Sequence, residues 1–187
     1  MIRAIITDFD GTLVDTFEAN YQAYDLAFKR NSLTISKEQY RACFGLRFDA
    51  FMQQMGIDDE DIKVSIKKDK AQLYPQCFDS LVPNAILIAF IHKMRFSGVK
   101  TAIASTAQKE NLMNVLNHLH LADLFDAIIA GTGVKKGKPD PEIYLKTMEV
   151  LGVSPEETLI FEDTEVGLQA AEASGASYMR ITQHFFE

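Results

Sequence analysis

The hydrophobic positions of this chain follow two patterns, which change near Pro83. Beyond Pro83, short apolar runs alternate with longer segments in which apolar residues recur at helical spacing. The short runs predict strands at 100–105, 127–130, 158–161 and 177–181. The longer segments predict helices at 84–96, 108–119, 141–151 and 166–174. An apolar run that includes Ile5 and Ile6 predicts one more strand near the N-terminus, so we expect an α/β fold with a parallel sheet and helices on both faces.

Residues 16–80 interrupt this alternation, because they show helical periods broken at Gly45 and Gly56 and no convincing strand. Capping signatures at 15–18 and 36–39 mark two helix starts, the first for a helix at 17–30. We therefore expect a core formed by 1–15 and 81–187, with an inserted helical domain at 16–80. An insert at this point would lie over the carboxyl ends of the strands, where open α/β sheets bind ligands.

Composition narrows the class of protein further. The 187 residues are 47% hydrophobic and 24% charged, as in globular proteins, and the net charge of -7 argues against a nucleic-acid partner. The longest apolar run, 85–91, is too short to cross a membrane, and the N-terminus leads into a strand rather than a secretory leader. Cys43 and Cys77 lack metal-ligand spacing and are predicted to be reduced thiols, so we expect a cytoplasmic protein.

Polar side chains follow the predicted strands closely in four segments. In the first, two aspartates spaced two apart precede Gly11, and such a pair implies a nearby cation or a shared proton. The four segments supply, in order, Asp8 with Asp10, Ser105 with Thr106, Lys138, and Glu162 with Asp163. Because parallel strands end at one edge of a sheet, we expect these groups to meet there. Carboxylates suit Mg²⁺, whereas an ammonium and a hydroxyl suit phosphate oxygens.

These four segments resemble the four motifs of the haloacid dehalogenase superfamily. The first motif corresponds to 8–16, the second to 104–106, the third to 136–141 and the fourth to 161–171. Order, spacing and strand context agree over almost the whole chain. The helical insert is similar to the small α-helical cap of the phosphoglycolate phosphatase and β-phosphoglucomutase branch. The resemblance implies a three-layer, Rossmann-like core that carries this cap.

The resemblance also implies a role for each motif residue. Asp8 would be the nucleophile that forms an aspartyl-phosphate, and Asp10 would act as general acid and then as general base. Ser105 would bind a phosphate oxygen, and Lys138 would neutralise charge on Asp8 and the phosphate.

The implied cofactor is Mg²⁺, and the implied metal ligands come from the first and fourth motifs. Asp8 and Asp163 would bind the ion through their carboxylates, and Asp10 through its backbone carbonyl. Glu162 would be either a further ligand or a partner of the ligands.

The implied function is hydrolysis of a small-metabolite phosphate ester, with Thr106, Arg47 and Asn20 as candidate substrate contacts. Phosphosugar mutase activity is the main alternative. Against it, Asn20 stands where β-phosphoglucomutases have a histidine, and 43–47 lacks their Gly-Val-Ser-Arg pattern. A non-catalytic protein that binds a phosphate ligand is a second alternative.

The end of the chain also departs from the family pattern. Many relatives have a further strand and helix where this sequence stops, at Glu187. We therefore expect a shorter sheet edge that leaves Phe185 and Phe186 in need of cover.

Overall fold

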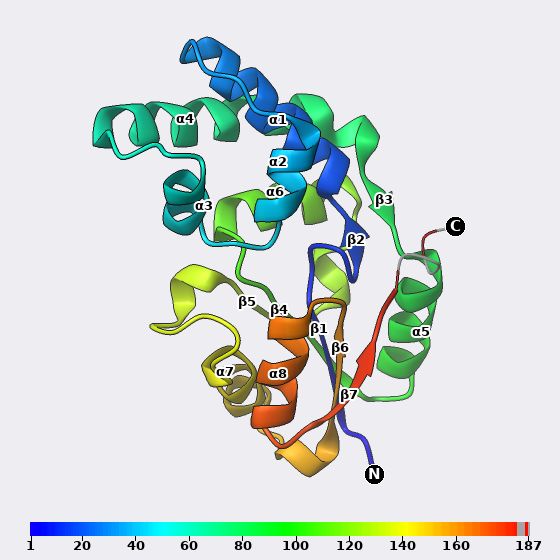
Figure 1. Cartoon of the computed structure of the whole chain (residues 1–187). Helices are drawn as coiled ribbons and strands as arrows, with labels where there is room; N and C mark the ends of the chain where they lie inside the picture. The colour runs from blue at the N-terminus through cyan, green and yellow to red at the C-terminus, as the bar shows by residue number, and fades with distance from the viewer. Residues whose placement is uncertain (183–185, 187) are drawn as a thin grey trace. The chain divides into compact units, whose positions relative to one another are not determined.

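The computed structural model describes residues 1–182 and residue 186, and the chain divides into two compact units. The first unit comprises Met1–Asp15 and Val82–Glu187, and the second comprises Thr16–Leu81 (Figure 1). The chain therefore leaves the first unit after its N-terminal strand and returns to it for the remaining strands.

A five-stranded parallel sheet forms the centre of the first unit, in the order β5-β4-β1-β6-β7 (Figure 1). Its strands are β1 (Ala4–Thr7), β4 (Lys100–Ala104), β5 (Ala127–Ile129), β6 (Thr158–Glu162) and β7 (Ser177–Arg180). The N-terminal strand β1 is central, since Ile5 pairs with Thr101 of β4 on one side and Leu159 of β6 on the other. The parallel α/β sheet predicted from the alternating pattern is confirmed.

Helices cover both faces of this sheet, which makes three layers. They are α5 (Ala85–Phe96), α6 (Lys109–His118), α7 (Glu142–Leu151) and α8 (Glu165–Ala173). Successive strand residues point to opposite faces. Ile6 and Ile160 pack in one buried cluster with residues of α7 and α8, whereas the next residue along β6, Phe161, meets Phe90 of α5 with ring centroids 5.8 Å apart. Full burial of an isoleucine such as Ile6 stabilises the fold by roughly 1.5–3 kcal/mol.

Two strands were not predicted, β2 (Val14–Asp15) and β3 (Val82–Pro83). They form an antiparallel ladder in which Val14 pairs with Pro83. A two-residue strand is too short to produce a hydrophobic period, so the sequence pattern carries no signal for it. The ladder joins the two points at which the chain leaves and re-enters the first unit. Short 3₁₀ turns complete the first unit: η2 (Ala122–Leu124), η3 (Gly131–Gly133) and η4 (Pro155–Glu157).

The second unit consists of helices, as its sequence pattern predicts. They are α1 (Phe17–Arg30), α2 (Lys37–Cys43), α3 (Phe48–Gln54), α4 (Glu60–Leu73) and η1 (Tyr74–Ser80). The capping box predicted at the start of α2 is confirmed, since Ser36 Oγ accepts from Gln39 N and the Gln39 side chain accepts from Ser36 N. The helix predicted at 17–30 is confirmed as α1, but its N-cap is Thr16, without a side-chain capping bond, rather than Asp15, the first residue of the 15–18 signature.

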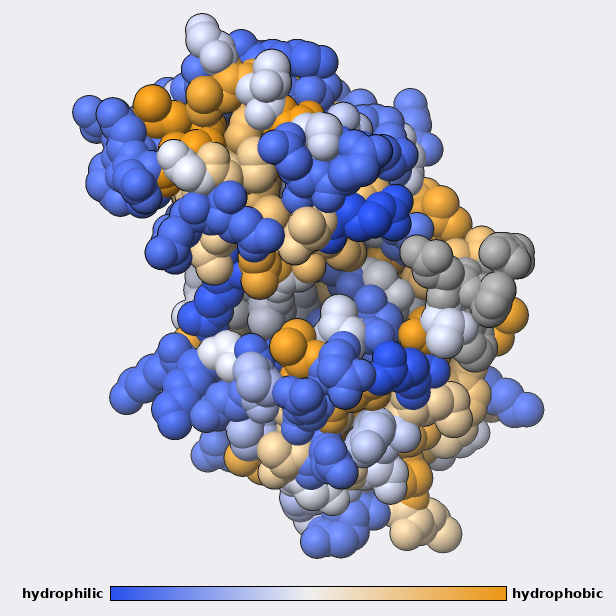
Figure 2. Space-filling view, viewed as in Figure 1, coloured by the Kyte–Doolittle hydropathy of each residue, from blue (hydrophilic) through white to orange (hydrophobic). Residues whose placement is uncertain are grey.

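No helix within the described residues is long and apolar enough to cross a membrane. On the face shown in Figure 2, hydrophilic residues are abundant on both units and are interspersed with hydrophobic ones. Cys43 and Cys77 are buried free thiols. Of the two C-terminal phenylalanines predicted to need cover, Phe185 lies outside the described residues and Phe186 is half-buried.

Candidate active site

Three neighbouring strands end at the same edge of the sheet, and each ends at a predicted site residue. Asp8 follows β1, Ser105 follows β4, and Glu162 is the last residue of β6. Backbone bonds continue the sheet to these positions: Asp8 N donates to Phe161 O at 2.9 Å, and Ser105 N donates to Ile129 O at 3.0 Å. Since β1 lies between β4 and β6, Asp8 is flanked by the other two strand ends.

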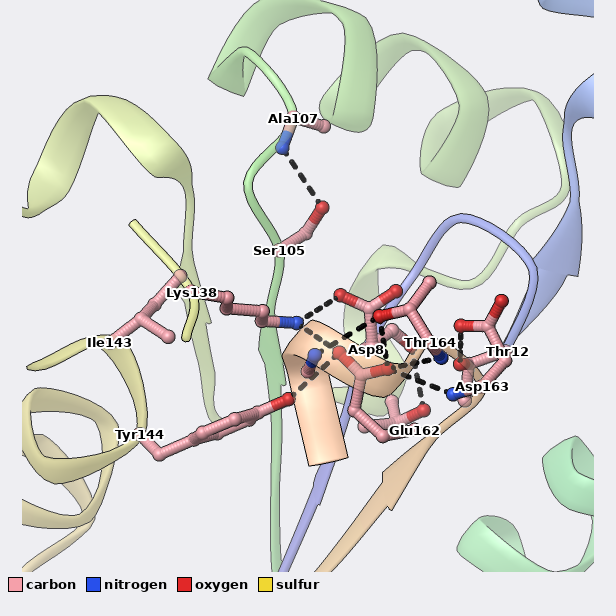
Figure 3. A network of polar contacts seen from close by, with 12 residues as sticks. Asp8, Thr12, Ser105, Ala107, Lys138, Ile143, Tyr144, Glu162, Asp163 and Thr164 are labelled. Carbon is pink, nitrogen blue, oxygen red and sulfur yellow. Dashed lines mark hydrogen bonds and ion pairs between the residues drawn. The ribbon is translucent and has the colours of Figure 1, made fainter. Parts of the chain in front are cut away.

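Lys138 links the first and last of these strand ends. Its Nζ lies 2.5 Å from Asp8 Oδ1 and 2.5 Å from Glu162 Oε1, and its side chain is only 5% exposed (Figure 3). The loop that carries Lys138 is anchored at the start of α7, because the backbone N–H groups of Lys135 and Lys136 donate to the Glu142 carboxylate. One ammonium is thus held between two buried carboxylates.

Burial and charge act in opposite directions on this pair. Burial raises the pKa of Asp8 well above its usual range, Lys138 opposes this, and the nearby Glu162 and Asp163 carboxylates raise the pKa further. Burial by itself would lower the pKa of Lys138, but the charge of Asp8 and that of Glu162 outweigh it and keep the pKa well above its usual range. Lys138 is therefore a cation, and its charge favours the ionised form of Asp8 against the effect of burial.

Glu162 is 1% exposed and accepts hydrogen bonds at both oxygens. Oε1 accepts from Lys138 Nζ and from the Tyr144 hydroxyl at 3.1 Å. Oε2 accepts from the backbone N–H groups of Asp163 and Thr164, at 2.8 and 2.9 Å, and from the Thr164 hydroxyl at 3.1 Å. Thr164 is also the N-cap of α8, so the carboxylate lies at the start of that helix. These hydrogen bonds fix the Glu162 carboxylate, which can therefore hold Lys138 in one position.

Asp163 lies against the turn that follows β1. The Thr12 hydroxyl donates to Asp163 Oδ1 at 2.8 Å, and a Cβ on Gly11 would lie 2.4 Å from Oδ2. Gly11, with φ +87°, therefore permits both the turn and the close approach. Burial raises the pKa of Asp163 to about 6; the Thr12 hydrogen bond opposes this and the charge of Glu162 adds to it.

The donor set at this edge fits a hard divalent cation. The carboxylates of Asp8 and Glu162 contact the one ammonium, and Asp163 adds a third carboxylate nearby, so negative charge is in excess. Burial, together with neighbouring negative charges, raises the pKa values of Asp8 and Asp163. A bound cation would lower both pKa values again.

The predicted metal ligands are the carboxylates of Asp8, Glu162 and Asp163 and the backbone carbonyl of Asp10. Within the described part of the chain, no group of three or more histidine, cysteine or acidic side chains is arranged to hold a metal ion. Glu162 does not fit the ligand role, because its two oxygens already accept from Lys138, Tyr144, and the backbone and hydroxyl of the 163–164 turn. Asp8 and Asp163 therefore remain the candidate carboxylate ligands.

The other predicted residues of the first unit lie close along the chain to these groups. Asp10 is half-buried in the turn after β1 and forms a bridge with Val14. Ser105 is 1% exposed, and its Oγ accepts from Ala107 N at 3.1 Å at the end of β4 (Figure 3). Thr106 is half-buried beside it. Ser105 and Thr106 thus lie where a loop follows a strand end.

The two predicted substrate contacts of the insert belong to the second unit. Asn20 is half-buried on α1, where its Nδ2 donates to Thr16 O at 3.1 Å and to the Tyr74 hydroxyl at 3.2 Å. Arg47 is exposed and is the N-cap residue of α3. Their roles in substrate binding stay predictions.

Sequence reasoning missed three residues that shape this site: Thr12, Tyr144 and Gly167. Thr12 holds Asp163, Tyr144 donates to Glu162, and Gly167 lies so close to Glu162 that a Cβ there would be 1.8 Å from Oε1. A signal existed for Tyr144, because a tyrosine on the apolar face of a helix usually needs a partner for its hydroxyl. Thr12 and Gly167 can be recognised as site residues only from their contacts in the folded structure.

Comparison with known proteins identifies relatives over nearly the whole chain. The family described as haloacid dehalogenase-like hydrolase matches residues 5–181. A phosphorylated carbohydrates phosphatase of Thermotoga maritima is 29% identical over 93% of this chain and 82% of its own length. A β-phosphoglucomutase of Bacillus subtilis is 25% identical over 97% of this chain and 84% of its own length. The crystal structure of CbbY from Rhodobacter sphaeroides with phosphate is 25% identical, has a TM-score of 0.85, and is matched over 100% of this chain and 89% of that one.

Proposed function

Because the chain belongs to the haloacid dehalogenase-like hydrolase family, we propose that it is a Mg²⁺-dependent phosphatase that hydrolyses the phosphomonoester of a small metabolite. The observation that carries this proposal is the buried Lys138 ammonium, 2.5 Å from both Asp8 and Glu162. A carboxylate that attacks a phosphate ester brings one anion to another, and a fixed ammonium at the point of attack lowers that barrier.

In the first step, an Asp8 carboxylate oxygen attacks the phosphorus atom and the ester P–O bond breaks. The product is an aspartyl-phosphate on Asp8 and an alkoxide that takes a proton from the Asp10 carboxyl group. Lys138 offsets negative charge on Asp8 and on the transferring group throughout, and the Ser105 hydroxyl at the neighbouring strand end donates to a phosphate oxygen.

In the second step, the Asp10 carboxylate takes a proton from water as the water oxygen attacks the phosphorus atom. The bond between phosphorus and Asp8 breaks, which releases inorganic phosphate and restores the Asp8 carboxylate. Asp10 returns to its protonated form, so atoms and charge balance over the cycle.

Asp8, Asp163 and the backbone carbonyl of Asp10 are the groups we assign to Mg²⁺. The ion would supply positive charge to Asp8 and to the phosphate oxygens. This assignment fits the raised pKa values of Asp8 and Asp163, because positive charge beside both carboxylates would favour their ionised forms.

We further propose that the first unit is the catalytic core and the second its cap, as the sequence predicts. The substrate class follows from the relatives, among them a phosphatase named for phosphorylated carbohydrates, so sugar phosphates are the first candidates. A cytoplasmic location is part of the proposal, supported by two buried cysteines that remain free thiols.

A phosphosugar mutase is the second candidate, because a β-phosphoglucomutase is among the relatives. It would use the same aspartyl-phosphate but return the phosphoryl group to another hydroxyl of the sugar. The feature that favours hydrolysis is Asn20 in place of the histidine of those mutases. Product analysis distinguishes the two, since a mutase yields an isomer and a phosphatase yields inorganic phosphate.

The test measures phosphate release from a panel of esters, with Mg²⁺ and with EDTA. The panel contains phosphoglycolate, hexose 1- and 6-phosphates and nucleoside monophosphates, and Asp8→Asn is the matched control. We expect metal-dependent release that is lost in Asp8→Asn. Conversion between hexose 1- and 6-phosphate without release would establish the mutase. Absence of both products with every ester, while phosphate still binds, would favour the non-catalytic binding protein.

A further inference from the structure

We propose that Tyr144 is a positioning residue for phosphoryl transfer, which fixes Glu162 and, through it, the Lys138 ammonium; this assignment rests on the proposed phosphatase function. Tyr144 lies on α7, outside the residues that the mechanism uses. Its side chain is fully buried, and its hydroxyl points toward the Lys138–Glu162 pair (Figure 3).

The hydroxyl and the ammonium share one acceptor atom. Tyr144 Oη donates to Glu162 Oε1 at 3.1 Å, and Lys138 Nζ donates to that same oxygen at 2.5 Å. The Lys138 Nζ also lies 5.0 Å from the centroid of the Tyr144 ring, within the range of a cation–π contact. Tyr144 therefore limits the position of Lys138 directly through its ring and indirectly through Glu162.

The shared acceptor explains how this affects the reaction. Glu162 and Asp8 compete for Lys138, with equal distances of 2.5 Å. A hydroxyl that donates to Glu162 Oε1 takes up part of the negative charge on that oxygen and holds the carboxylate in one orientation. Without it, Glu162 binds the ammonium more strongly or turns, and in either case Lys138 is less well placed to serve Asp8 and the phosphate.

The position itself argues that the hydroxyl is not required for packing. Tyr144 lies in the buried cluster that Ile143, Met148 and Leu151 of the same helix form with the sheet. A phenylalanine would fill the same volume without placing a hydroxyl in an apolar layer, where it is costly unless it is hydrogen-bonded. Here the hydroxyl reaches Glu162, a residue that also contacts Lys138.

The experiment compares Tyr144→Phe with Thr147→Val under steady-state turnover of the best ester from the panel. Thr147 is a matched control, because it is a fully buried hydroxyl on the same helix whose bond goes to Ile143 O. We expect Tyr144→Phe to lower kcat about tenfold while KM changes less than twofold. Thr147→Val should keep kcat within about twofold of wild type, whatever its effect on stability.

A double-mutant cycle with Glu162→Gln separates positioning from a general folding defect. If Tyr144 acts through Glu162, adding Tyr144→Phe to Glu162→Gln lowers kcat less than about twofold. A tenfold loss in both backgrounds would show that Tyr144 does not act through Glu162 and would overturn the proposal, as would wild-type kcat in Tyr144→Phe alone. An inactive wild-type protein would instead overturn the proposed phosphatase function, and this assignment with it.

Discussion

At the scale of single residues, the site depends on how buried charges are compensated. Asp8 and Glu162 are 7% and 1% exposed, and both contact the Lys138 ammonium. Removal of one member of a buried ionic group leaves its partners uncompensated, which costs roughly 3–5 kcal/mol unless they take up protons. The same substitution would remove positive charge from the transition state.

Lys138→Ala should therefore lower both activity and stability. We expect a loss in kcat on the order of 10²–10³, similar to the loss of a group that stabilises a developing anion. Lys136→Ala is the control, because that side chain is 73% exposed and contacts Asp140 at the surface. Measured kcat and Tm should both fall for position 138 and neither for position 136. Equal kcat in the two variants would contradict the role assigned to Lys138.

A substitution at Gly167 can show whether activity requires Glu162 to keep its position. In a helix, alanine is favoured over glycine by about 1 kcal/mol, so Gly167→Ala would stabilise α8 if space allowed. A Cβ there would lie 1.8 Å from Glu162 Oε1, and the overlap is relieved when Glu162 swings away from Lys138. We expect kcat to fall up to ~100-fold and Tm to fall as well, because the displaced Glu162 loses its buried hydrogen bonds and its contact with Lys138. Gly133→Ala, whose Cβ would meet Ile129 at an ordinary 3.7 Å, should leave kcat unchanged.

Most residues of the site follow a strand end, which is why the sequence predicts them. Asp8, Ser105 and Glu162 each terminate an apolar run, and the topology brings such ends together. The orientation of side chains is not encoded in this way. The contact of Tyr144 with Glu162 depends on how α7 packs, and that of Thr12 with Asp163 on the turn after β1. The periodicity of hydrophobic residues carries no information on such contacts between distant side chains.

At the scale of elements, hydrophobic periods predict the helix at 17–30 and the four helices and four strands beyond Pro83, and their ends agree with the structure within one residue. The exceptions have physical reasons. The β2–β3 ladder is two residues long and pairs Val14 with Pro83, 69 positions along the chain, so it is a tertiary contact rather than a local preference. The N-cap of α1 is Thr16, one residue beyond the start of the predicted 15–18 signature.

Asp126 connects three elements, and its loss should weaken the edge of the sheet. Its carboxylate accepts from Thr101 N of β4 at 2.8 Å and from Arg95 of α5 at 2.6 Å, immediately before β5. Burial would raise the pKa of Asp126, but these hydrogen bonds outweigh it and lower the pKa below its usual value. The bonds therefore stabilise the fold above the unfolded-state pKa, and this contribution is lost as the pH falls through the lowered value.

We expect Asp126→Asn to reduce the free energy of unfolding by ~1 kcal/mol at pH 7, a modest value because the side chain is 38% exposed. Urea unfolding at pH 7 and pH 3 measures this free energy, and the difference in free energy between the variant and wild type should shrink at pH 3. Asp123→Asn, at an exposed position of η2, serves as control and should match wild type at both values. A difference that grows on acidification would contradict the stabilising role of the ionised Asp126 carboxylate.

At the scale of the whole molecule, the net charge is -7, and Asp8, Glu162 and Asp163 are three acidic residues that act on one another at one edge of the sheet. Burial beside like charge raises the pKa of Asp163 from 3.8 to about 6, so the metal-free native state binds a proton more readily than the unfolded chain does. Stability from this group is therefore full below pH 4 and declines as the pH rises to about 6. Mg²⁺ would compete with that proton and reverse the decline.

Thermal unfolding in EDTA and in Mg²⁺, from pH 4 to pH 8, tests whether a proton and Mg²⁺ compete for Asp163. The control is Asp163→Asn, whose side chain cannot ionise. In EDTA above pH 6, the variant should be more stable than wild type, by at most ~3 kcal/mol for the change of about two pKa units. Mg²⁺ should raise the wild-type Tm more at pH 8 than at pH 5 and leave the variant nearly unchanged. If Mg²⁺ stabilised both proteins equally at every pH, the ion would bind elsewhere, and Asp163 would not be its ligand.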